Sequence, residues 1–201
     1  MSVSVVGYGL GNLGSVLNML RRIGDDPHTA TTPEEIAASE RLLLPGIGAF
    51  DAGMRLLGDT GLTDSIRDFA ASGRPVLGIC LGMQLLLDSS EEGVEPGLSL
   101  IPGTSVKFDE ASGLRIPHVG WNTVEPTRTD PLVVGLPDES RFYFVHSYHV
   151  VPQSPDATLG VTVYGAPFAS MIRSGNVMGA QYHPEKSHAF GMQILRNFSE
   201  L

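Results

Sequence analysis

The sequence holds a single cysteine, Cys80, among 201 residues. One thiol cannot form a disulfide within the chain, so the fold must be stable without one, as in a reducing cytosol. No apolar run approaches the roughly 20 residues of a membrane-spanning helix. The N-terminus also lacks the basic region, apolar run and small-residue cleavage site of a secretory signal. We therefore expect a cytoplasmic protein with no membrane partner.

Positive charge is also scarce. The chain has 13 Lys and Arg against 22 Asp and Glu, a formal net charge of −9. That balance argues against a nucleic-acid partner, because non-specific binding needs a basic surface. Hydrophobic residues make up 42% and charged residues 17%, which is typical of an ordinary globular protein. At this length we expect a single domain spanning residues 1–201, large enough to bury its own core.

Metal-binding patterns are missing, although the chain has six histidines. No H-x-x-x-H or C-x-x-C spacing occurs around His118, His146, His149 or His188. We expect His146 and His149 on opposite faces of one strand, because successive side chains alternate along a strand. The sequence therefore predicts no metal site.

The first half of the chain alternates strands and helices. This order predicts a parallel sheet that is covered on both faces. We expect strands at residues 3–6, 27–31, 41–44 and 76–79, and helices at 16–23, 33–38, 51–57 and 63–71.

The second half is richer in strands. After residue 87, the polar segment 91–97 is expected to be a solvated loop. We expect strands at residues 105–108, 122–125, 141–145, 159–164, 169–173 and 177–182, a hairpin turn at 174–176 and a last helix at 188–198. The sequence therefore predicts an α/β fold with additional β strands in its second half.

Cys80 stands between a predicted strand and a helix start, in Gly-Ile-Cys-Leu-Gly-Met-Gln at residues 78–84. Glycines two residues before and after a nucleophile are typical of a nucleophile elbow. The backbone turns sharply there, and Gly78 and Gly82 avoid side chains that would clash. The first N–H groups of the helix would favour the thiolate. A lone cysteine is more often a small buried side chain, but this setting predicts a catalytic nucleophile.

Residues 9–14 match the dinucleotide-binding pattern G-x-G-x-x-G, after a strand and at a helix start. The pattern also needs an acidic residue at the end of a second strand, about 20 residues further on. Asp25 and Asp26 precede the weak second strand instead of following it. We therefore favour a tight turn that packs helix on strand, and a non-catalytic nucleotide-binding module stays open as an alternative.

His183 and Glu185 follow the last predicted strand. Residues two apart in an extended segment project to the same side, and Pro184 forces His183 towards an extended backbone. We therefore expect the imidazole to contact the carboxylate. With Cys80, these residues would supply a nucleophile, a base and an orienting acid. Both segments are expected just beyond the carboxyl ends of parallel strands, where active sites collect.

Three segments resemble the signatures of class I (triad) glutamine amidotransferases. They are Pro-Gly-Ile-Gly at residues 45–48, the run at 78–84 and His-Pro-Glu at 183–185. Ile47 is a mild departure, because the family more often has valine there. The resemblance implies a mostly parallel central sheet flanked by helices, and a glutaminase without a cofactor.

The resemblance also implies roles for individual residues. Cys80, His183 and Glu185 would be catalytic. The Leu81 N–H and a backbone N–H from Gly46 or Ile47 would form the oxyanion hole. The glutamine-binding residues that the resemblance implies are Gly48, Gln84, His146, Ser147 and Tyr148.

Four further segments, at residues 8–13, 118–122, 143–148 and 183–187, resemble one group within that family. This group comprises the glutaminase subunits of imidazole glycerol phosphate synthases. The resemblance implies a heterodimer that passes ammonia from L-glutamine to a (β/α)₈-barrel cyclase. That partner makes imidazole glycerol phosphate and an aminoimidazole carboxamide ribotide in histidine biosynthesis. The positions implied to face it are Asn12, Trp121, Asn122, Tyr143 and Lys186.

Two enzyme alternatives stay open. A glutaminase subunit of anthranilate, purine or pyridoxal phosphate synthesis is one, and Asn12 and residues 118–122 argue against it. A thiol hydrolase or protease on a similar scaffold is the other. It would explain Cys80 and a histidine, but not residues 45–48 together with Gln84. A plain core position is an equally simple explanation of Trp121.

Overall fold

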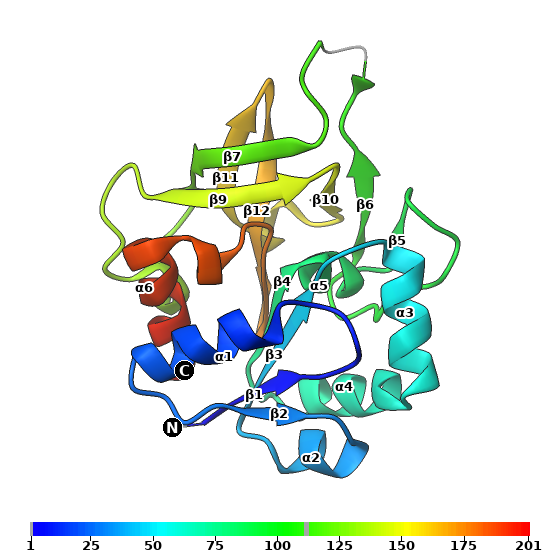
Figure 1. The fold of residues 1–201 in the computed structure, drawn as a ribbon. Helices are drawn as coiled ribbons and strands as arrows, with labels where there is room; N and C mark the ends of the chain where they lie inside the picture. Colours follow the sequence, from blue (N-terminus) through cyan, green and yellow to red (C-terminus); the bar gives the residue numbers. More distant parts are fainter. Residues whose placement is uncertain (1, 111–112) are drawn as a thin grey trace.

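The computed structural model describes residues 2–110 and 113–201, with helices and strands that alternate in the first half (Figure 1). The helices are α1 (Leu13–Arg22), α2 (Pro33–Ala38), α3 (Phe50–Asp59), α4 (Leu62–Ala71), α5 (Leu81–Leu85) and α6 (His188–Ser199), with 3₁₀ turns η2 (Pro131–Val133), η3 (Pro155–Ala157) and η4 (Pro184–Lys186). The strands are β1 (Val3–Val6), β2 (His28–Ala30), β3 (Arg41–Gly46), β4 (Val76–Cys80), β5 (Ser89–Ser90), β6 (Gly103–Lys107), β7 (His118–Thr123), β8 (Glu125–Pro126), β9 (Arg141–His146), β10 (Tyr148–Pro152), β11 (Thr158–Tyr164), β12 (Ala166–Ser174) and β13 (Val177–Ala180).

The central sheet has eleven strands within the described residues, with the path β2-β1-β3-β4-β13-β12-β10-β6-β5. Strands β2, β1, β3, β4 and β13 pair in parallel, whereas β12, β10 and β6 join in antiparallel fashion. A separate two-stranded sheet, β7–β9, lies beside it (Figure 1). This topology confirms the predicted α/β fold, with a mostly parallel sheet and additional strands in the second half.

Apolar side chains cover both faces of the parallel strands. Leu42 and Leu44 of β3 belong to one hydrophobic cluster, which includes side chains of α2, α3, α4 and α5. Leu43 belongs to a second cluster, which includes side chains of α1 and α6. Successive residues of a strand face opposite sides, so an uninterrupted apolar run is buried on both. With the faces covered, the ends of the strands are left to carry a site.

Local signals set several helix boundaries where the sequence predicts them. Gly24 follows α1 at φ +92°, a conformation that favours glycine. Thr32 and Glu35 form a capping box at the start of α2, and Pro33 occupies its first turn. Within the part of the chain that the structure describes, no helix has the length and apolar character to span a bilayer.

Most strand predictions miss the observed bounds by one to three residues, and three of the differences are instructive. The strand predicted at 41–44 continues to Gly46, because the chain stays paired with β4 through Gly46 and Cys80. The strand predicted at 122–125 is divided, because β7 pairs with β9 in one sheet and β8 pairs with β11 in the other. The strand predicted at 177–182 ends at Ala180. These differences arise from pairing partners, which the local sequence does not specify.

Candidate active site

Cys80 is the last residue of β4 and lies at the turn into α5. Its φ of 55° and ψ of −111° fall outside the regions that side chains favour. A Cβ on Gly82 would lie 1.9 Å from the carbonyl oxygen of Leu44, and one on Gly78 would lie 2.6 Å from the carbonyl oxygen of Gly82. The predicted sharp turn and the need for both glycines are therefore confirmed.

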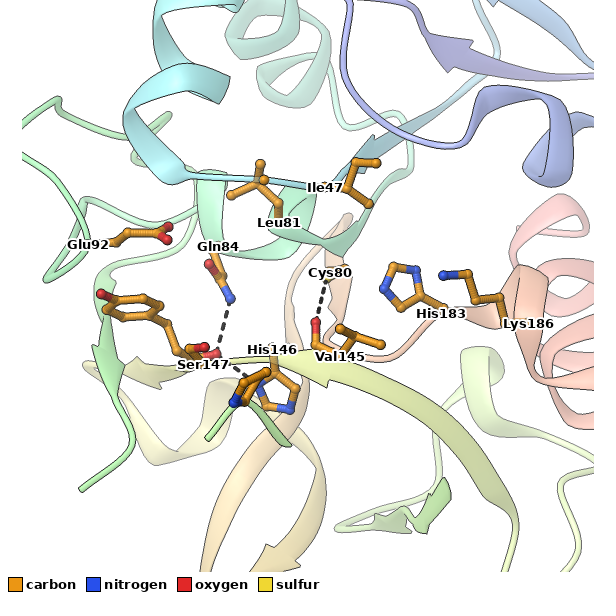
Figure 2. Close-up of a pocket in the computed structure, with 13 residues that line it drawn as sticks. Ile47, Cys80, Leu81, Gln84, Glu92, Val145, His146, Ser147, His183 and Lys186 are labelled. Carbon is orange, nitrogen blue, oxygen red and sulfur yellow. Dashed lines mark hydrogen bonds between the residues drawn. The ribbon is translucent and has the colours of Figure 1, made fainter. Parts of the chain in front are cut away.

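A cavity of about 310 Å³ lies against Cys80, where β3 and β4 end. In Figure 2, Cys80, His183 and Lys186 lie on one side of it, and Gln84 and Glu92 on the other. Its lining includes every residue that the resemblance implies for glutamine binding. The lining residues are Ile47, Gly48, Cys80, Leu81, Gln84, Glu92, Pro117, Val145, His146, Ser147, Tyr148, His183 and Lys186.

Backbone contacts place His183 beside the thiol. Its N–H donates to the carbonyl oxygen of Tyr143 at 2.9 Å, which ties the segment after β13 to β9. The buried hydroxyl of Ser187 donates to the carbonyl oxygen of His183 at 2.6 Å and accepts the N–H of Tyr143 at 3.0 Å. The backbone of His183 is extended (φ −99°, ψ 96°), as the following proline predicts.

The imidazole of His183 contacts the carboxylate of Glu185, with 2.9 Å between Nδ1 and Oε1. The contact confirms the prediction, but its predicted geometry is wrong. Glu185 lies in the 3₁₀ turn η4 and not in an extended strand. Burial lowers the pKa of His183. Hydrogen bonds to Cys80 and Glu185, and the negative charges of both, outweigh it and raise the pKa to about 9. The imidazole therefore stays protonated at neutral pH.

The backbone at Gly46 packs against the start of α5. A Cβ on Gly46 would lie 2.8 Å from both the amide nitrogen of Gly82 and Cβ of Leu81. The hydroxyl of Tyr8 donates to the carbonyl oxygen of Pro45 at 2.8 Å and holds the strand end in place. Ile47, 46% exposed, has a φ outside the positive region. Gly46, Ile47 and Leu81, which the resemblance implies for the oxyanion hole, therefore lie together beside the nucleophile.

Two glutamine side chains connect the cavity wall to the thiol. Nε2 of Gln84 donates to the carbonyl oxygen of Tyr148 at 3.2 Å and to Oε1 of Gln181 at 3.1 Å. Nε2 of Gln181 donates in turn to Sγ of Cys80 at 3.8 Å. Gln181 was not predicted from the sequence, because it is fully buried and has no motif of its own.

Glu92 is a second residue that sequence reasoning missed. We expected residues 91–97 to be a solvated loop, but Glu92 turns back to line the cavity (Figure 2). Its Oε2 accepts the N–H of Phe50 at 2.8 Å, at the start of α3. A helix N-terminus stabilises a carboxylate, which explains why the side chain folds inwards. The site thereby gains a negative group opposite His183.

The prediction that His146 and His149 face opposite ways is wrong. Their rings lie 5.2 Å and 4.8 Å from the ring of Phe108, and both also contact Phe168. The alternation is interrupted because β9 ends at His146 and β10 begins at Tyr148. Among residues 2–110 and 113–201, no three His, Cys, Asp or Glu side chains are grouped as metal ligands.

Three of the residues implied to face a partner form one exposed patch with His188. The ring of Trp121 is 40% exposed, stacks on His188 at 5.3 Å and meets Tyr143 edge-on at 5.9 Å. Nζ of Lys186 lies 5.7 Å from the centre of the Tyr143 ring. We call these four residues the aromatic patch. The exposure of Trp121 excludes the alternative that it is a core residue.

The other two positions implied to face a partner are not members of this patch. Asn12 is exposed and caps α1, where its side chain accepts the N–H of Ser15. The side chain of Asn122 turns towards β11 and donates to the carbonyl oxygen of Val163 at 2.9 Å. In the glycine pattern at residues 9–14, a Cβ on Gly14 would meet open space, so close packing of helix on strand does not require this glycine.

Sequence comparisons agree with this geometry. The family model for Glutamine amidotransferase class-I matches residues 8–200. The chain is 48% identical to "Imidazole glycerol phosphate synthase subunit HisH 2" of Pseudomonas aeruginosa, over 99% of each chain. It is 46% identical to the HisH subunit of Methanosarcina barkeri, over 99% of this chain and 98% of that one.

Solved structures share the fold at low sequence identity. "Crystal structure of glutamine amidotransferase" superposes with a TM-score of 0.77 at 19% identity, over 98% of this chain and 97% of that one. "Structure of PurLQS from Thermotoga maritima" gives 0.76 at 19% identity, over 99% and 97%. The family match covers the glycine pattern at residues 9–14, so that pattern needs no separate nucleotide-binding explanation. The chain belongs to the class I glutamine amidotransferase family and, within it, to the HisH subunits of imidazole glycerol phosphate synthase.

Proposed function

We propose that this chain is the glutaminase subunit of an imidazole glycerol phosphate synthase, with Cys80, His183 and Glu185 as its catalytic residues. The observation that carries the proposal is the buried contact of His183 with Glu185, beside the strained Cys80, at one cavity. The close HisH relatives supply the substrate and the pathway, which are L-glutamine and histidine biosynthesis. The same relationship disfavours a protease or a glutaminase of another pathway.

The first half of the reaction follows from the protonation state of His183. With its pKa at about 9, this imidazole is charged at neutral pH and stabilises a thiolate beside it. The thiolate of Cys80 attacks the side-chain amide carbon of glutamine. The backbone N–H groups of Leu81 and of Gly46 or Ile47 bind the negative oxygen that forms. His183 then gives its proton to the leaving nitrogen, which departs as ammonia and leaves a glutamyl thioester.

The second half restores the site. Neutral His183 takes a proton from water, and the resulting hydroxide attacks the thioester carbon. The carbon–sulfur bond breaks, glutamate leaves, and Cys80 and His183 return to their starting thiolate and imidazolium. Glu185 orients the ring and stabilises its charge throughout, as the third member of a triad does.

The cavity wall supports recognition of an amino acid. The carboxylate of Glu92 suits the α-ammonium group of glutamine, since it is the negative group opposite His183 (Figure 2). Both N–H groups of Gln84 are engaged, so its oxygen is the atom left for the substrate. The backbone of Gly48, Ser147 and Tyr148 completes the binding surface.

The partner surface is the aromatic patch together with Asn12. Trp121 and Tyr143 are aromatic residues of the kinds that are enriched in protein interfaces, and their rings meet edge-on at this surface. The patch lies next to the site, because Lys186 belongs to it and also lines the cavity. We propose that a (β/α)₈-barrel cyclase docks here, forms a heterodimer and receives the ammonia.

The test is glutamate release from L-glutamine by the chain alone, and by the chain with its cyclase and the ribonucleotide ligand of that cyclase. We expect the lone chain to be nearly inactive, and the partner with its ligand to raise kcat more than they change KM. Complementation of a histidine auxotroph identifies the pathway. Full activity of the lone chain, or no activity in the complex, would contradict the proposal.

A further inference from the structure

A line of hydrogen bonds links two buried histidines to the cavity wall. Nδ1 of His118 lies 3.0 Å from Nε2 of His146, across the β7–β9 pair. Nδ1 of His146 lies 2.8 Å from the carbonyl oxygen of Tyr148. Nδ2 of Asn122 lies 3.4 Å from Nε2 of His118. The catalytic mechanism uses neither imidazole ring; His146 lines the cavity, and His118 lies behind it.

The donor of each hydrogen bond follows from the ends of the line. A carbonyl oxygen only accepts, so Nδ1 of His146 carries its proton and Nε2 accepts. Nδ1 of His118 must then donate, which leaves its Nε2 as the acceptor. Oδ1 of Asn122 accepts the N–H of Thr123 at 2.9 Å, so its nitrogen is the atom that faces His118. One arrangement of protons satisfies every bond, with both rings in the Nδ1–H tautomer.

The carbonyl of Tyr148 joins this line to the site. It accepts from His146 and also from Gln84, whose amide continues through Gln181 to the sulfur of Cys80. Two donors therefore hold one carbonyl of the glutamine-binding wall. Without the bond from His146, this carbonyl would keep only one of these two side-chain donors, the Gln84 amide.

Packing keeps His118 in place and uncharged. Its ring lies between Phe144 and Tyr164, stacked at 4.9 Å and 4.0 Å. Burial lowers the pKa of His118 to about 4, and burial is also the main reason that the pKa of His146 falls to about 3. Both rings are therefore neutral at pH 7, as the single arrangement of protons requires.

We propose that His118 and His146 are positioning residues for glutamine binding, acting through the carbonyl of Tyr148 and the amide of Gln84. This inference rests on the proposed glutaminase function. Among the described residues, neither ring makes a hydrogen bond to the thiol of Cys80 or to the His183–Glu185 pair. Their loss therefore weakens the binding of glutamine more than it slows the chemical steps.

Two substitutions at His118 separate the hydrogen bond from the packing. His118→Phe keeps an aromatic ring between Phe144 and Tyr164 but removes the donor, so Nε2 of His146 is left buried and unpaired. His118→Asn loses the stacking but keeps a donor nitrogen close to the position of Nδ1. We expect KM for L-glutamine to rise about tenfold in His118→Phe, the usual effect of one unpaired buried group, with kcat within threefold of the parent. In His118→Asn, KM should stay within about threefold of the parent.

Both variants are assayed in complex with the cyclase and its ribonucleotide ligand, by glutamate release at varied L-glutamine, alongside thermal melting. Phe144→Leu is the matched control, because it loosens the same stack and breaks no hydrogen bond of the line. The inference is overturned if KM rises across the three variants in step with their loss of melting temperature, or if KM is unchanged in His118→Phe. If KM rises in His118→Phe and not in His118→Asn or Phe144→Leu, the inference is supported.

A measurement on the unmodified chain separates this inference from the proposed function. Nitrogen-15 NMR of the imidazoles should show both rings in the Nδ1–H tautomer and uncharged at pH 7. An Nε2–H tautomer or a charged ring at either position overturns the inference even where the enzyme is active. If the parent complex releases no glutamate, the proposed function fails, and the inferred role in glutamine binding fails with it. The Nδ1–H tautomers would then support the hydrogen-bonded line alone.

Discussion

Two histidines line the same cavity and are held in opposite states. His183 and His146 are 3% and 6% exposed, so burial lowers the pKa of each. His183 contacts a carboxylate and a thiol, and its pKa rises to about 9. His146 has no carboxylate or thiol as a hydrogen-bond partner, so burial dominates and its pKa falls to about 3. Because burial lowers both pKa values, the partners of His183 account for the difference between the two rings.

The difference assigns the two rings to different tasks. A ring that is charged at neutral pH can stabilise a thiolate and protonate a leaving group, which is the role of His183. A ring that stays neutral, with both nitrogens engaged, can fix the position of a carbonyl but cannot supply a proton, which is the role of His146.

Replacing Cys80 with alanine removes the nucleophile and one of the groups that raise the pKa of His183. We expect glutamine-dependent synthesis by the complex to fall by about 10⁵-fold or more, because the thioester cannot form. Synthesis from added ammonium should remain, which controls for folding and for docking of the cyclase. Residual turnover of glutamine at a substantial rate would show that Cys80 is not the nucleophile.

Glu185→Gln keeps the shape of the side chain and removes the charge that supports His183. We expect kcat for glutamate release to fall by about 10³-fold, less than the effect of losing Cys80. NMR titration should also show a lower pKa for His183 in this variant, with that of His146 unchanged. A kcat near that of the parent would mean that Glu185 does not orient the base.

The N–H groups of His183 and His146 already have partners, so the oxyanion must be bound by backbone N–H groups. Ile47→Pro deletes one candidate N–H and should lower kcat by about 10²–10³-fold, the usual effect of one lost oxyanion donor. The measurement is steady-state glutamate release by the complex, with the melting temperature as the control for folding. A kcat equal to that of the parent would remove Ile47 from the oxyanion hole.

Ile47→Gly tests whether backbone strain keeps the lone chain inactive. A flip of the Gly46–Ile47 peptide towards the thiol would place Ile47 at positive φ, which costs on the order of 1–3 kcal/mol for a β-branched residue. In the structure Ile47 is outside that region. Ile47→Gly keeps the N–H and removes the strain, so partner-free glutamate release should rise several-fold. If the variant is no faster than the parent, strain at this residue does not hold the enzyme off.

The two rings should also affect stability in opposite pH windows. The folded pKa of His183 is above the unfolded value of about 6.5, so its contribution is complete below pH 6.5 and is lost as pH rises to 9. The folded pKa of His146 is below that value, so its contribution is present above pH 6.5 and is lost towards pH 3. The contribution of each histidine to the free energy of unfolding is on the order of a few kcal/mol.

The measurement is urea denaturation between pH 4 and pH 9.5, which gives the free energy of unfolding of the parent and of the variants His183→Asn and His146→Asn. Relative to the parent, His183→Asn should flatten the alkaline side of the stability profile, and His146→Asn should flatten the acid side. A parent profile with the same slope on both sides of pH 6.5 would contradict the opposite shifts.

The elbow at Cys80 could be predicted from sequence because its constraints are local. A sharp strand-to-helix turn needs glycines at fixed distances, and Gly78 and Gly82 stand at those distances with no room for a Cβ. The His183–Glu185 contact was also predictable, since the partners are two positions apart in the sequence, although the 3₁₀ turn that forms it was not expected.

The rest of the site depends on contacts that are distant in sequence. Glu92 enters the cavity because the start of α3, 42 residues away, supplies an N–H for its carboxylate. His118 meets His146 only because β7 pairs with β9 in one register. Pairing and register depend on the whole fold, so a local pattern cannot show these residues. The division of β7 from β8 was missed for the same reason.

The most direct test of the assigned nucleophile is covalent labelling of the complex with a diazoketone analogue of glutamine, followed by peptide mapping. The single thiol of Cys80 should carry the label, excess L-glutamine should protect it, and the cyclase with its ligand should speed the reaction. Cys80→Ala should stay unlabelled. Label on another residue, or labelling of Cys80 that glutamine does not slow, would contradict the account.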